Sequence, residues 1–232
     1  MKNYKWILFD ADETLFRFDA FSGLQLMFSR FGTPFTKQDY KKFQVINSAL
    51  WLDYQNKRIS AQELQERRFA VWSDKLRIPA CDLSHTFQTA MAEISTLLEG
   101  AYSLLNTLKG KCKLGIITNG FTALQDARLA KTGLKDHFDI LVISEQVGIT
   151  KPDRGIFDHA LALMGNPARE HVLMVGDNPS TDIQGGINAG FHTCWLNVAR
   201  TPAPKGITPQ YQVASLMELE CLFQNNFPII EK

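Results

Sequence analysis

The chain has 232 residues, of which 45% are hydrophobic and 21% are charged, and its formal net charge is +1. These values are typical of a globular chain with one domain, or one domain with an insertion, that buries a core. No basic run gives the electrostatic footprint of a nucleic-acid-binding protein. No stretch reaches the roughly 18 apolar residues of a membrane span, and the apolar run at residues 6–9 is too short for a signal peptide. We therefore expect a cytoplasmic protein that binds neither nucleic acid nor membrane.

Five short apolar runs, each ending at a polar residue or a turn, are expected to be strands. They span residues 5–9, 113–117, 139–143, 172–175 and 193–196. Runs this apolar suit strands buried on both faces, as in a parallel sheet covered by helices. Stretches of helical length lie between them at residues 122–132 and 152–164. The alternation predicts an α/β fold with a Rossmann-like parallel sheet.

About a hundred residues separate the first two expected strands, far more than a crossover connection needs. Helical signals fill this stretch. Ser60 and Glu63 have the spacing of a capping box, and Thr36 with Asp39 resembles one. Apolar residues at helical spacing follow Ser60 as far as residue 76, and another helix is expected from Asp82. We expect residues 18–94 to form an inserted all-helical cap domain and residues 1–17 and 95–232 to form the sheet domain, with a helix over residues 99–108.

Polar side chains lie at the carboxyl ends of the expected strands, where open α/β sheets bind ligands. They are Asp10, Thr118, Ser144 and Asp177, with Lys151 a short loop further on. Carboxylates for a metal ion, a hydroxyl donor and a lysine together suit a phosphate site.

Asp10 and Asp12 alternate along an extended segment, so both can face one site. Two neighbouring carboxylates are tolerable when a cation neutralises them, and Mg²⁺ prefers such oxygen ligands. One carboxylate can attack phosphorus while the other serves as general acid and base.

The other polar residues have structural explanations when each is taken alone. Thr118, before Asn119 and Gly120, would be a helix N-cap, and Lys151 would be a solvated lysine. Asp182 would be the N-cap of a helix over residues 183–189.

Taken together and in this order, these motifs resemble those of the haloacid dehalogenase superfamily. The resemblance covers nearly the whole chain and implies that Asp10 is the nucleophile and Asp12 the acid and base. It implies Mg²⁺ on the Asp10 carboxylate, the Asp12 backbone carbonyl and Asp177, with Asp182 outside the direct ligands. It also implies that Thr118 holds the phosphate and that Lys151 neutralises Asp10 and the transferring group. The dehalogenases of that superfamily lack the residue corresponding to Asp12, so its presence favours phosphoryl transfer.

Several stretches are similar to the bacterial pyrimidine 5′-nucleotidases. They are residues 9–16 (FDADETLF), 116–121 (IITNGF), 142–145 (VISE), 185–190 (GGINAG), 194–197 (CWLN) and 50–56 (LWLDYQN). This resemblance implies hydrolysis of nucleoside monophosphates such as dUMP, dTMP and UMP. Pro179 departs from the expected pattern and weakens the assignment of Asp182.

Thr118, Asn119, Lys151 and Phe18 are the expected substrate-binding residues, and a small nucleoside monophosphate is the expected partner. Phe18 follows the acid pair and is expected to line the hinge to the cap. Two alternatives remain: a phosphatase of phosphoglycolate or a sugar phosphate, and a non-catalytic binding module on the same fold. The oligomeric state, monomer or homodimer, stays open.

Overall fold

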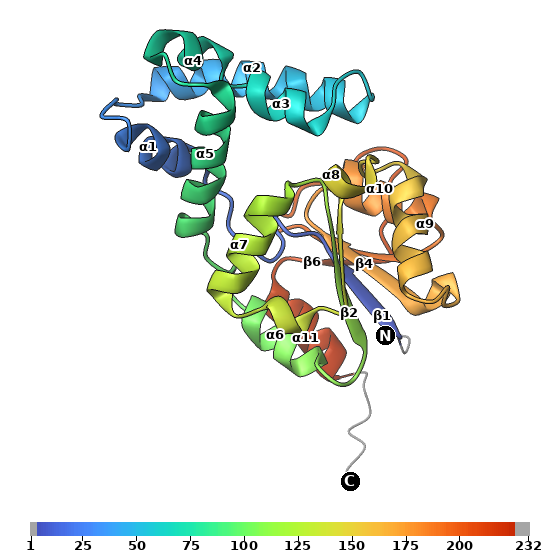
Figure 1. Cartoon of the computed structure of the whole chain (residues 1–232). Coiled ribbons are helices and arrows are strands. Elements are labelled where there is room, and N and C mark those ends of the chain that lie inside the picture. The colour runs from blue at the N-terminus through green and yellow to red at the C-terminus, as the bar shows by residue number, and fades with distance from the viewer. Residues whose placement is uncertain (1–3, 226–232) are drawn as a thin grey trace. The chain divides into compact units, whose positions relative to one another are not determined.

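The computed structural model describes residues 4–225 and contains a six-stranded parallel sheet in the order β3-β2-β1-β4-β5-β6 (Figure 1). The strands are β1 Trp6–Phe9, β2 Lys113–Thr118, β3 Ile140–Ile143, β4 Val172–Gly176, β5 His192–Leu196 and β6 Tyr211–Val213. The predicted α/β fold with a parallel sheet is confirmed, and β1 to β5 correspond to the five expected strands.

The chain groups into two compact units. We call Met1–Arg17, Thr96–Gly120 and Thr132–Lys232 the sheet unit, and Phe18–Ser95 with Phe121–Lys131 the helical unit. The helices of the sheet unit are α6 Ala101–Leu108, α8 Ser144–Val147, α9 Arg154–Leu163, α10 Gln184–Asn188 and α11 Leu216–Gln224. Short 3-10 turns cover Lys135–His137 and Arg169–His171, and a π turn covers Pro179–Ile183. The helical unit contains α1 Ala20–Ser29, α2 Lys37–Gln55, α3 Ala61–Arg67, α4 Ala70–Leu76, α5 Ala80–Ile94 and nearly all of α7 Thr122–Thr132.

Strand β1 lies at the centre of the sheet, and all four of its residues are buried. Trp6 and Leu8 pack with Ile156 and Phe157 of α9 in one hydrophobic cluster. Because side chains alternate along a strand, Ile7 and Phe9 face the opposite side of the sheet. Figure 1 shows α9 and α10 on one side of the sheet, with α6 and α11 packed together on the other. This cover on both faces explains why the strands read as continuous apolar runs.

The capping boxes expected in the helical unit are confirmed. Thr36 Oγ1 accepts from the Asp39 backbone N–H at 3.2 Å, and the Asp39 carboxylate accepts from the Thr36 N–H at 3.0 Å. Ser60 and Glu63 make the same exchange at 3.1 and 2.8 Å. These reciprocal bonds satisfy two free N–H groups at the start of α2 and of α3.

Several expected helix boundaries were wrong, including that of α6, which begins at Ala101 rather than at residue 99. The helical spacing after Ser60 spans two helices, because Phe69 leaves helical geometry with φ −108° and ψ 0° between α3 and α4. Helix α5 begins at Ala80 rather than at Asp82, and α9 begins after the Asp153 N-cap rather than at residue 152. Within residues 4–225, no helix is long and apolar enough to cross a membrane.

Candidate active site

Three of the predicted site residues meet at the carboxyl edge of the sheet. Asp10 follows β1, Thr118 ends β2, and Asp177 follows β4. Strand β1 pairs with β2 on one side and with β4 on the other, so these strand ends are neighbours. The backbone N–H of Asp10 donates to Val175 O at 2.8 Å, which fixes the start of the loop after β1.

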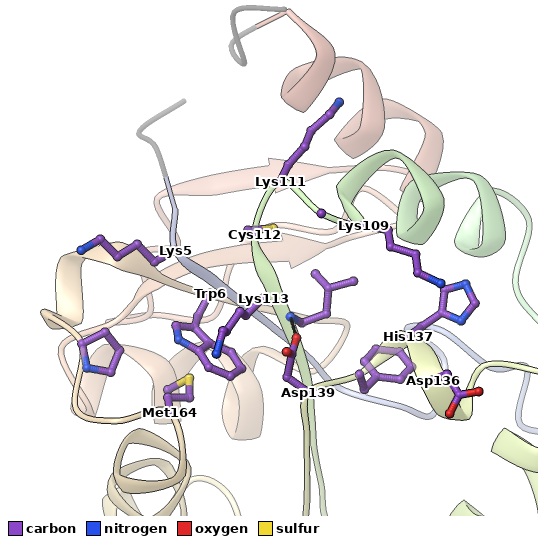
Figure 2. Close-up of a pocket in the computed structure, with 14 residues that line it drawn as sticks. Lys5, Trp6, Lys109, Lys111, Cys112, Lys113, Asp136, His137, Asp139 and Met164 are labelled. Carbon is purple, nitrogen blue, oxygen red and sulfur yellow. Dashed lines mark hydrogen bonds between the residues drawn. The ribbon is translucent and has the colours of Figure 1, made fainter. Parts of the chain in front are cut away.

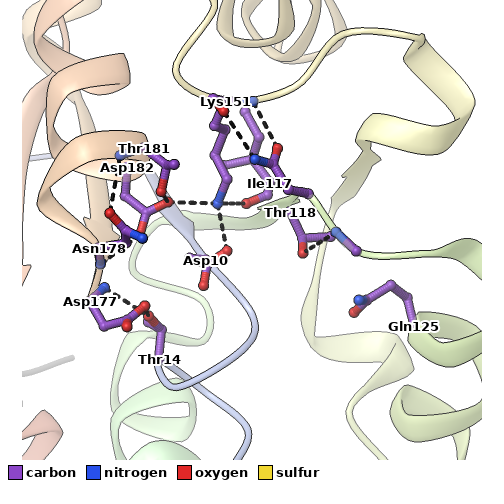
Figure 3. Close-up of polar contacts among 12 residues, drawn as sticks. Asp10, Thr14, Ile117, Thr118, Gln125, Lys151, Asp177, Asn178, Thr181 and Asp182 are labelled. Atoms are coloured by element: carbon purple, nitrogen blue, oxygen red, sulfur yellow. Dashed lines mark hydrogen bonds and ion pairs between the residues drawn. The ribbon is translucent and has the colours of Figure 1, made fainter. Parts of the chain in front are cut away.

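Lys151 connects the acids of this edge (Figure 3). Its ammonium Nζ lies 2.5 Å from Asp10 Oδ1 and 2.7 Å from Asp182 Oδ1, and it donates to Ile117 O at 2.8 Å. The whole residue is 1% exposed. Burial disfavours the ammonium, but the charges of Asp10 and Asp182 outweigh that effect and raise the pKa of Lys151. The cation is therefore fixed beside the predicted nucleophile.

Asn119 positions the loop that carries this lysine. The backbone N–H of Lys151 donates to Asn119 Oδ1 at 2.7 Å, and Asn119 Nδ2 donates to Lys151 O at 3.0 Å. Both ends of the amide are thus used within the protein. The prediction that Asn119 binds substrate stays a prediction, and the geometry gives it a positioning role toward Lys151.

Thr118 and Asp12 belong to the same unit as Asp10. The side chain of Thr118 is buried, and its hydroxyl accepts from the Gly120 N–H at 3.1 Å. Asp12 forms an isolated bridge with Phe16 and is half-buried. Burial raises the pKa of Asp10, Lys151 opposes the rise, and the charges of Asp182 and Asp12 add to it. Asp12 therefore lies close enough to Asp10 to influence its ionisation.

Asp177 is held by hydrogen bonds that the sequence did not predict. Asp177 Oδ1 accepts from the Thr14 hydroxyl at 3.3 Å, and Asp177 N–H donates back to Thr14 Oγ1 at 3.1 Å. The indole Nε1 of Trp195 donates to Asp177 O at 2.8 Å. Thr14 belongs to the first motif, and its complete burial is the feature that marks it as part of the site.

Asp182 lies inside the π turn, so the prediction that it is a helix N-cap was wrong. The N-cap is Asn178, whose side chain accepts from Ser180 N–H at 2.9 Å. The Asp182 carboxylate instead accepts from the Asn178 N–H at 3.0 Å while it pairs with Lys151. A Cβ added to Gly176 would meet Asp182 Oδ2 at 2.3 Å, so only glycine allows this approach.

The carboxylates of Asp10, Asp177 and Asp182 can hold a metal ion. One ligand atom from each lies within 4.8 Å of the others. When ionised, the three carboxylates and the Lys151 ammonium together carry two net negative charges. Hard divalent cations prefer carboxylate oxygens as ligands. Burial and the charge of Asp182 raise the pKa of Asp177 to about 6, as expected for acids whose charge is not fully neutralised. This cluster differs from the predicted metal set, because it contains Asp182 in place of Asp12. That the backbone carbonyl of Asp12 is a metal ligand stays a prediction.

Phe18 belongs to the helical unit and is 40% exposed, the largest exposure among the predicted site residues. The aromatic residues Phe21 and Trp72 pack in the core of that unit. The structure thus brings Asp10, Lys151 and Asp177 together but does not test a role for Phe18 in substrate binding.

A cavity of about 760 Å³ lies at the opposite edge of the sheet, beside the amino ends of β1 and β2 (Figure 2). Lysines 5, 109, 111 and 113 line it. Their ammonium groups point away from one another in Figure 2, and Lys113 lies over the Trp6 ring at 5.3 Å. The cavity therefore does not converge on a ligand as the cluster around Lys151 does.

Comparisons with known proteins agree with this geometry. The chain is 54% identical over 219 residues to pyrimidine 5′-nucleotidase YjjG of Escherichia coli (strain K12), covering 94% of this chain and 97% of that protein. It is 36% identical to pyrimidine 5′-nucleotidase PynA of Streptococcus pneumoniae, covering 99% of this chain and 98% of that protein.

A solved structure extends the likeness to the fold. The magnesium-bound crystal structure of YfnB from Bacillus subtilis, assigned to the HAD-hydrolases, matches 97% of this chain and 100% of its own with a TM-score of 0.83 at 29% identity. The sequence model of the haloacid dehalogenase-like hydrolases matches residues 4–190, which include every residue of the acid and lysine cluster. This chain belongs to the haloacid dehalogenase-like hydrolase family.

Proposed function

We propose that this protein is a magnesium-dependent pyrimidine 5′-nucleotidase that hydrolyses nucleoside monophosphates such as dUMP, UMP and dTMP. The 54% identity to a pyrimidine 5′-nucleotidase over 94% of the chain carries the substrate class. The buried contact between Asp10 and Lys151 supports the chemistry, because it keeps a cation at the carboxylate that would attack phosphorus.

In the proposed reaction, a carboxylate oxygen of Asp10 attacks the phosphorus and the bond from phosphorus to the 5′-oxygen breaks. Asp12 donates a proton to the leaving 5′-oxygen, which departs as the nucleoside alcohol. The phosphoryl group is then an aspartyl phosphate on Asp10. Asp12, now a carboxylate, takes a proton from water as the water attacks phosphorus, and inorganic phosphate leaves Asp10.

Charge stabilisation would come from groups fixed before the substrate arrives. The Lys151 ammonium neutralises charge on Asp10 and on the transferring oxygens, and Thr118 donates to one of these oxygens. Asp10, Asp177 and Asp182 would hold Mg²⁺, and their crowding within 4.8 Å supports this assignment. When bound, Mg²⁺ supplies electrostatic stabilisation of the phosphoryl oxygens.

We propose that the helical unit is the cap that selects the substrate. The compact helical unit of Phe18–Ser95 and Phe121–Lys131 supports this proposal, since it lies apart in the chain from the residues of the acid and lysine cluster. The sheet unit carries the reacting groups, so the identity of the nucleoside has to be read by other residues.

The experiment that tests the proposal measures phosphate release with Mg²⁺ from a panel of substrates. The panel is dUMP, UMP, dTMP, CMP, AMP, GMP, phosphoglycolate and glucose 6-phosphate. We expect the highest kcat/KM for the uracil and thymine nucleotides. Equal or better rates on the small acid or the sugar would keep the Asp10 chemistry but discard the nucleotidase assignment. No release from any compound would favour a binding module that retains the fold.

A further inference from the structure

Strand β5 carries a buried tryptophan that the proposed reaction does not use. Trp195 is 4% exposed and is the register partner of Gly176, the last residue of β4. Its indole Nε1 donates to the backbone oxygen of Asp177 at 2.8 Å, and both residues belong to the sheet unit. Trp195 lies in the stretch at residues 194–197 (CWLN) that is similar to the pyrimidine 5′-nucleotidases. A contact between this stretch and an acid of the site calls for a functional explanation.

The hydrogen bond from Trp195 continues the sheet one residue past the end of its ladder. The register of β4 and β5 ends at the pair of Gly176 and Trp195. Asp177 is the next residue along the chain, and the indole supplies to its carbonyl the kind of donor that a backbone N–H supplies within the ladder. A buried indole N–H needs an acceptor, and here the acceptor belongs to a member of the acid cluster.

Asp177 is held from the sides of both strands that flank β4. On the β1 side, Thr14 Oγ1 accepts from the Asp177 N–H at 3.1 Å and donates to its carboxylate at 3.3 Å. On the β5 side, Trp195 holds the carbonyl. The N–H and the C=O of one residue lie in different peptide groups, so both peptide groups of Asp177 are fixed. The carboxylate then moves only by rotation about the bonds of a short side chain.

The ordinary core tryptophan of this sheet is Trp6, which makes the comparison informative. Trp6 is 5% exposed, begins β1 at the opposite edge of the sheet, and packs in a hydrophobic cluster with Leu8 and Ile156. Trp195 is equally buried but lies at the edge that carries the acids. Strand β5 also contacts the π turn that carries Asp182. The position of Trp195 therefore suits a role in the acid cluster beyond filling the core.

We propose that Trp195 is a positioning residue of the metal site, which fixes the carbonyl of Asp177 and thereby keeps the Asp177 carboxylate directed toward those of Asp10 and Asp182. The inference rests on the proposed function and deepens it, because the cation that these acids would hold is the proposed Mg²⁺. Groups that orient metal ligands without touching the metal contribute about 10- to 100-fold to metal affinity or activity. Trp195 thus acts on the affinity for the cation, through Asp177, and not on the reacting atoms.

The test removes the indole N–H and measures metal binding directly. Trp195→Phe keeps an aromatic ring in the buried position but loses the donor to Asp177. Mn²⁺, which takes the same oxygen ligands as Mg²⁺, is titrated into the metal-free protein, and free Mn²⁺ is followed by electron paramagnetic resonance. We expect the dissociation constant of Mn²⁺ and the Mg²⁺ concentration for half-maximal activity on dUMP each to rise by about tenfold or more. At saturating Mg²⁺, kcat should stay within about threefold of the wild type, because the reacting groups are unchanged.

Trp6→Phe is the matched control, since it removes the same atoms from an equally buried tryptophan of the same sheet. Its metal constants are expected to equal those of the wild type. A merely structural role of Trp195 would lower the free energy of unfolding of Trp195→Phe and leave both metal constants unchanged. That result would overturn the inference.

If Trp195→Phe does not fold, the wild-type protein decides. The chain has four tryptophans, so its nitrogen–proton correlation spectrum should contain four indole resonances. The Trp195 resonance, identified by replacing Trp6, Trp51 and Trp72 in turn, should shift when Mg²⁺ is added, whereas that of Trp6 should not. An unmoved Trp195 resonance at saturating Mg²⁺ would contradict the inference.

Failure of the inference and failure of the proposed function are distinguishable in the wild-type protein. A wild type that binds no Mn²⁺ would refute the metal site, and the role of Trp195 with it. A wild type that binds Mn²⁺ but releases phosphate from no compound of the substrate panel would refute the proposed function alone.

Discussion

Thr14 and Asp177 hold each other by two hydrogen bonds, although 163 positions separate them in the sequence. The Thr14 hydroxyl donates to the carboxylate and accepts from the backbone N–H of the same aspartate. Thr14 is fully buried in the turn that follows Asp10. This pair therefore joins the loops that carry the first and the last acids of the site, and it fixes one of the three carboxylates of the proposed metal site.

Replacing Thr14 by valine should weaken metal binding with little change in shape. Valine keeps the volume but removes both hydrogen bonds, and supporting contacts of this kind are worth about 10- to 100-fold in metal affinity or activity. We expect the Mg²⁺ concentration for half-maximal activity to rise by about tenfold or more. Thr14→Ser, which keeps the hydroxyl, is the control and should stay near the wild type. An unchanged Mg²⁺ requirement in Thr14→Val would show that this contact does not position Asp177.

The sequence predicted the sheet and the acids at its edge well, for a physical reason. Strands buried on both faces are continuous apolar runs, and the polar residues that end them are easily recognised. Asp10, Thr118 and Asp177 were found in this way. Strand β6 and helix α11 were not predicted. Strand β6 has only three residues, of which one is buried, so it does not form a long apolar run.

What the sequence could not predict depends on contacts between distant segments. The pairing of Lys151 with Asp182 requires the π turn, whereas Asp182 taken alone was expected to be an ordinary helix N-cap. The bond from the Trp195 indole to Asp177 joins two strand ends that only the sheet order brings together.

Removing the carboxylate of Asp10, the proposed nucleophile, should abolish turnover and leave the fold intact. Asp10→Asn is nearly isosteric, but the amide cannot form the aspartyl phosphate, and loss of a nucleophile costs about 10⁴-fold or more in kcat. The measurement is steady-state phosphate release from dUMP, with circular dichroism to verify the fold. Wild-type turnover in Asp10→Asn would refute the covalent mechanism.

Chelation should stop the reaction reversibly. The cluster of Asp10, Asp177 and Asp182 is the proposed Mg²⁺ site, and phosphoryl oxygens depend on such a cation for charge stabilisation. We expect excess EDTA to remove activity on dUMP and added Mg²⁺ to restore it fully. Ca²⁺ serves as a comparison ion, since its larger size and looser geometry should restore much less activity. Turnover that persists in excess chelator would remove the metal from the mechanism.

Lys151 should be needed for stability as well as for rate. Lys151→Met leaves the carboxylates of Asp10 and Asp182 buried without their shared cation, and removing one partner of a buried pair costs about 3–5 kcal/mol. We expect a clear fall in the free energy of unfolding in EDTA and recovery of part of it with Mg²⁺, which would neutralise the same acids. Lys111→Met, at an exposed lysine of the sheet unit, is the control and should be neutral. Equal stability of the two variants in EDTA would contradict the role of the Lys151 ion pairs.

Asp177 should make the metal-free protein less stable as the pH rises. Burial, with the charge of Asp182 adding to it, raises the pKa of Asp177 from 3.8 to about 6. A carboxyl whose folded pKa is raised is protonated more easily in the folded state, so its favourable contribution is complete below about pH 4 and is lost as the pH rises through about 6. Because the residue is partly exposed, we expect a loss of about 1–3 kcal/mol across this window.

Asp177→Asn isolates this effect, because the amide is neutral at every pH and can still accept from Thr14. In EDTA, the variant should have nearly the stability of the wild type at pH 4 and exceed it by about 1–3 kcal/mol at pH 8, where the wild-type carboxylate is ionised. The measurement is urea denaturation of both proteins at the two pH values. Adding Mg²⁺ at pH 8 should reverse the order, since only the wild type has the full set of carboxylates to bind the cation. A stability difference that is the same at pH 4 and pH 8 would show that Asp177 carries no unneutralised charge in the metal-free site.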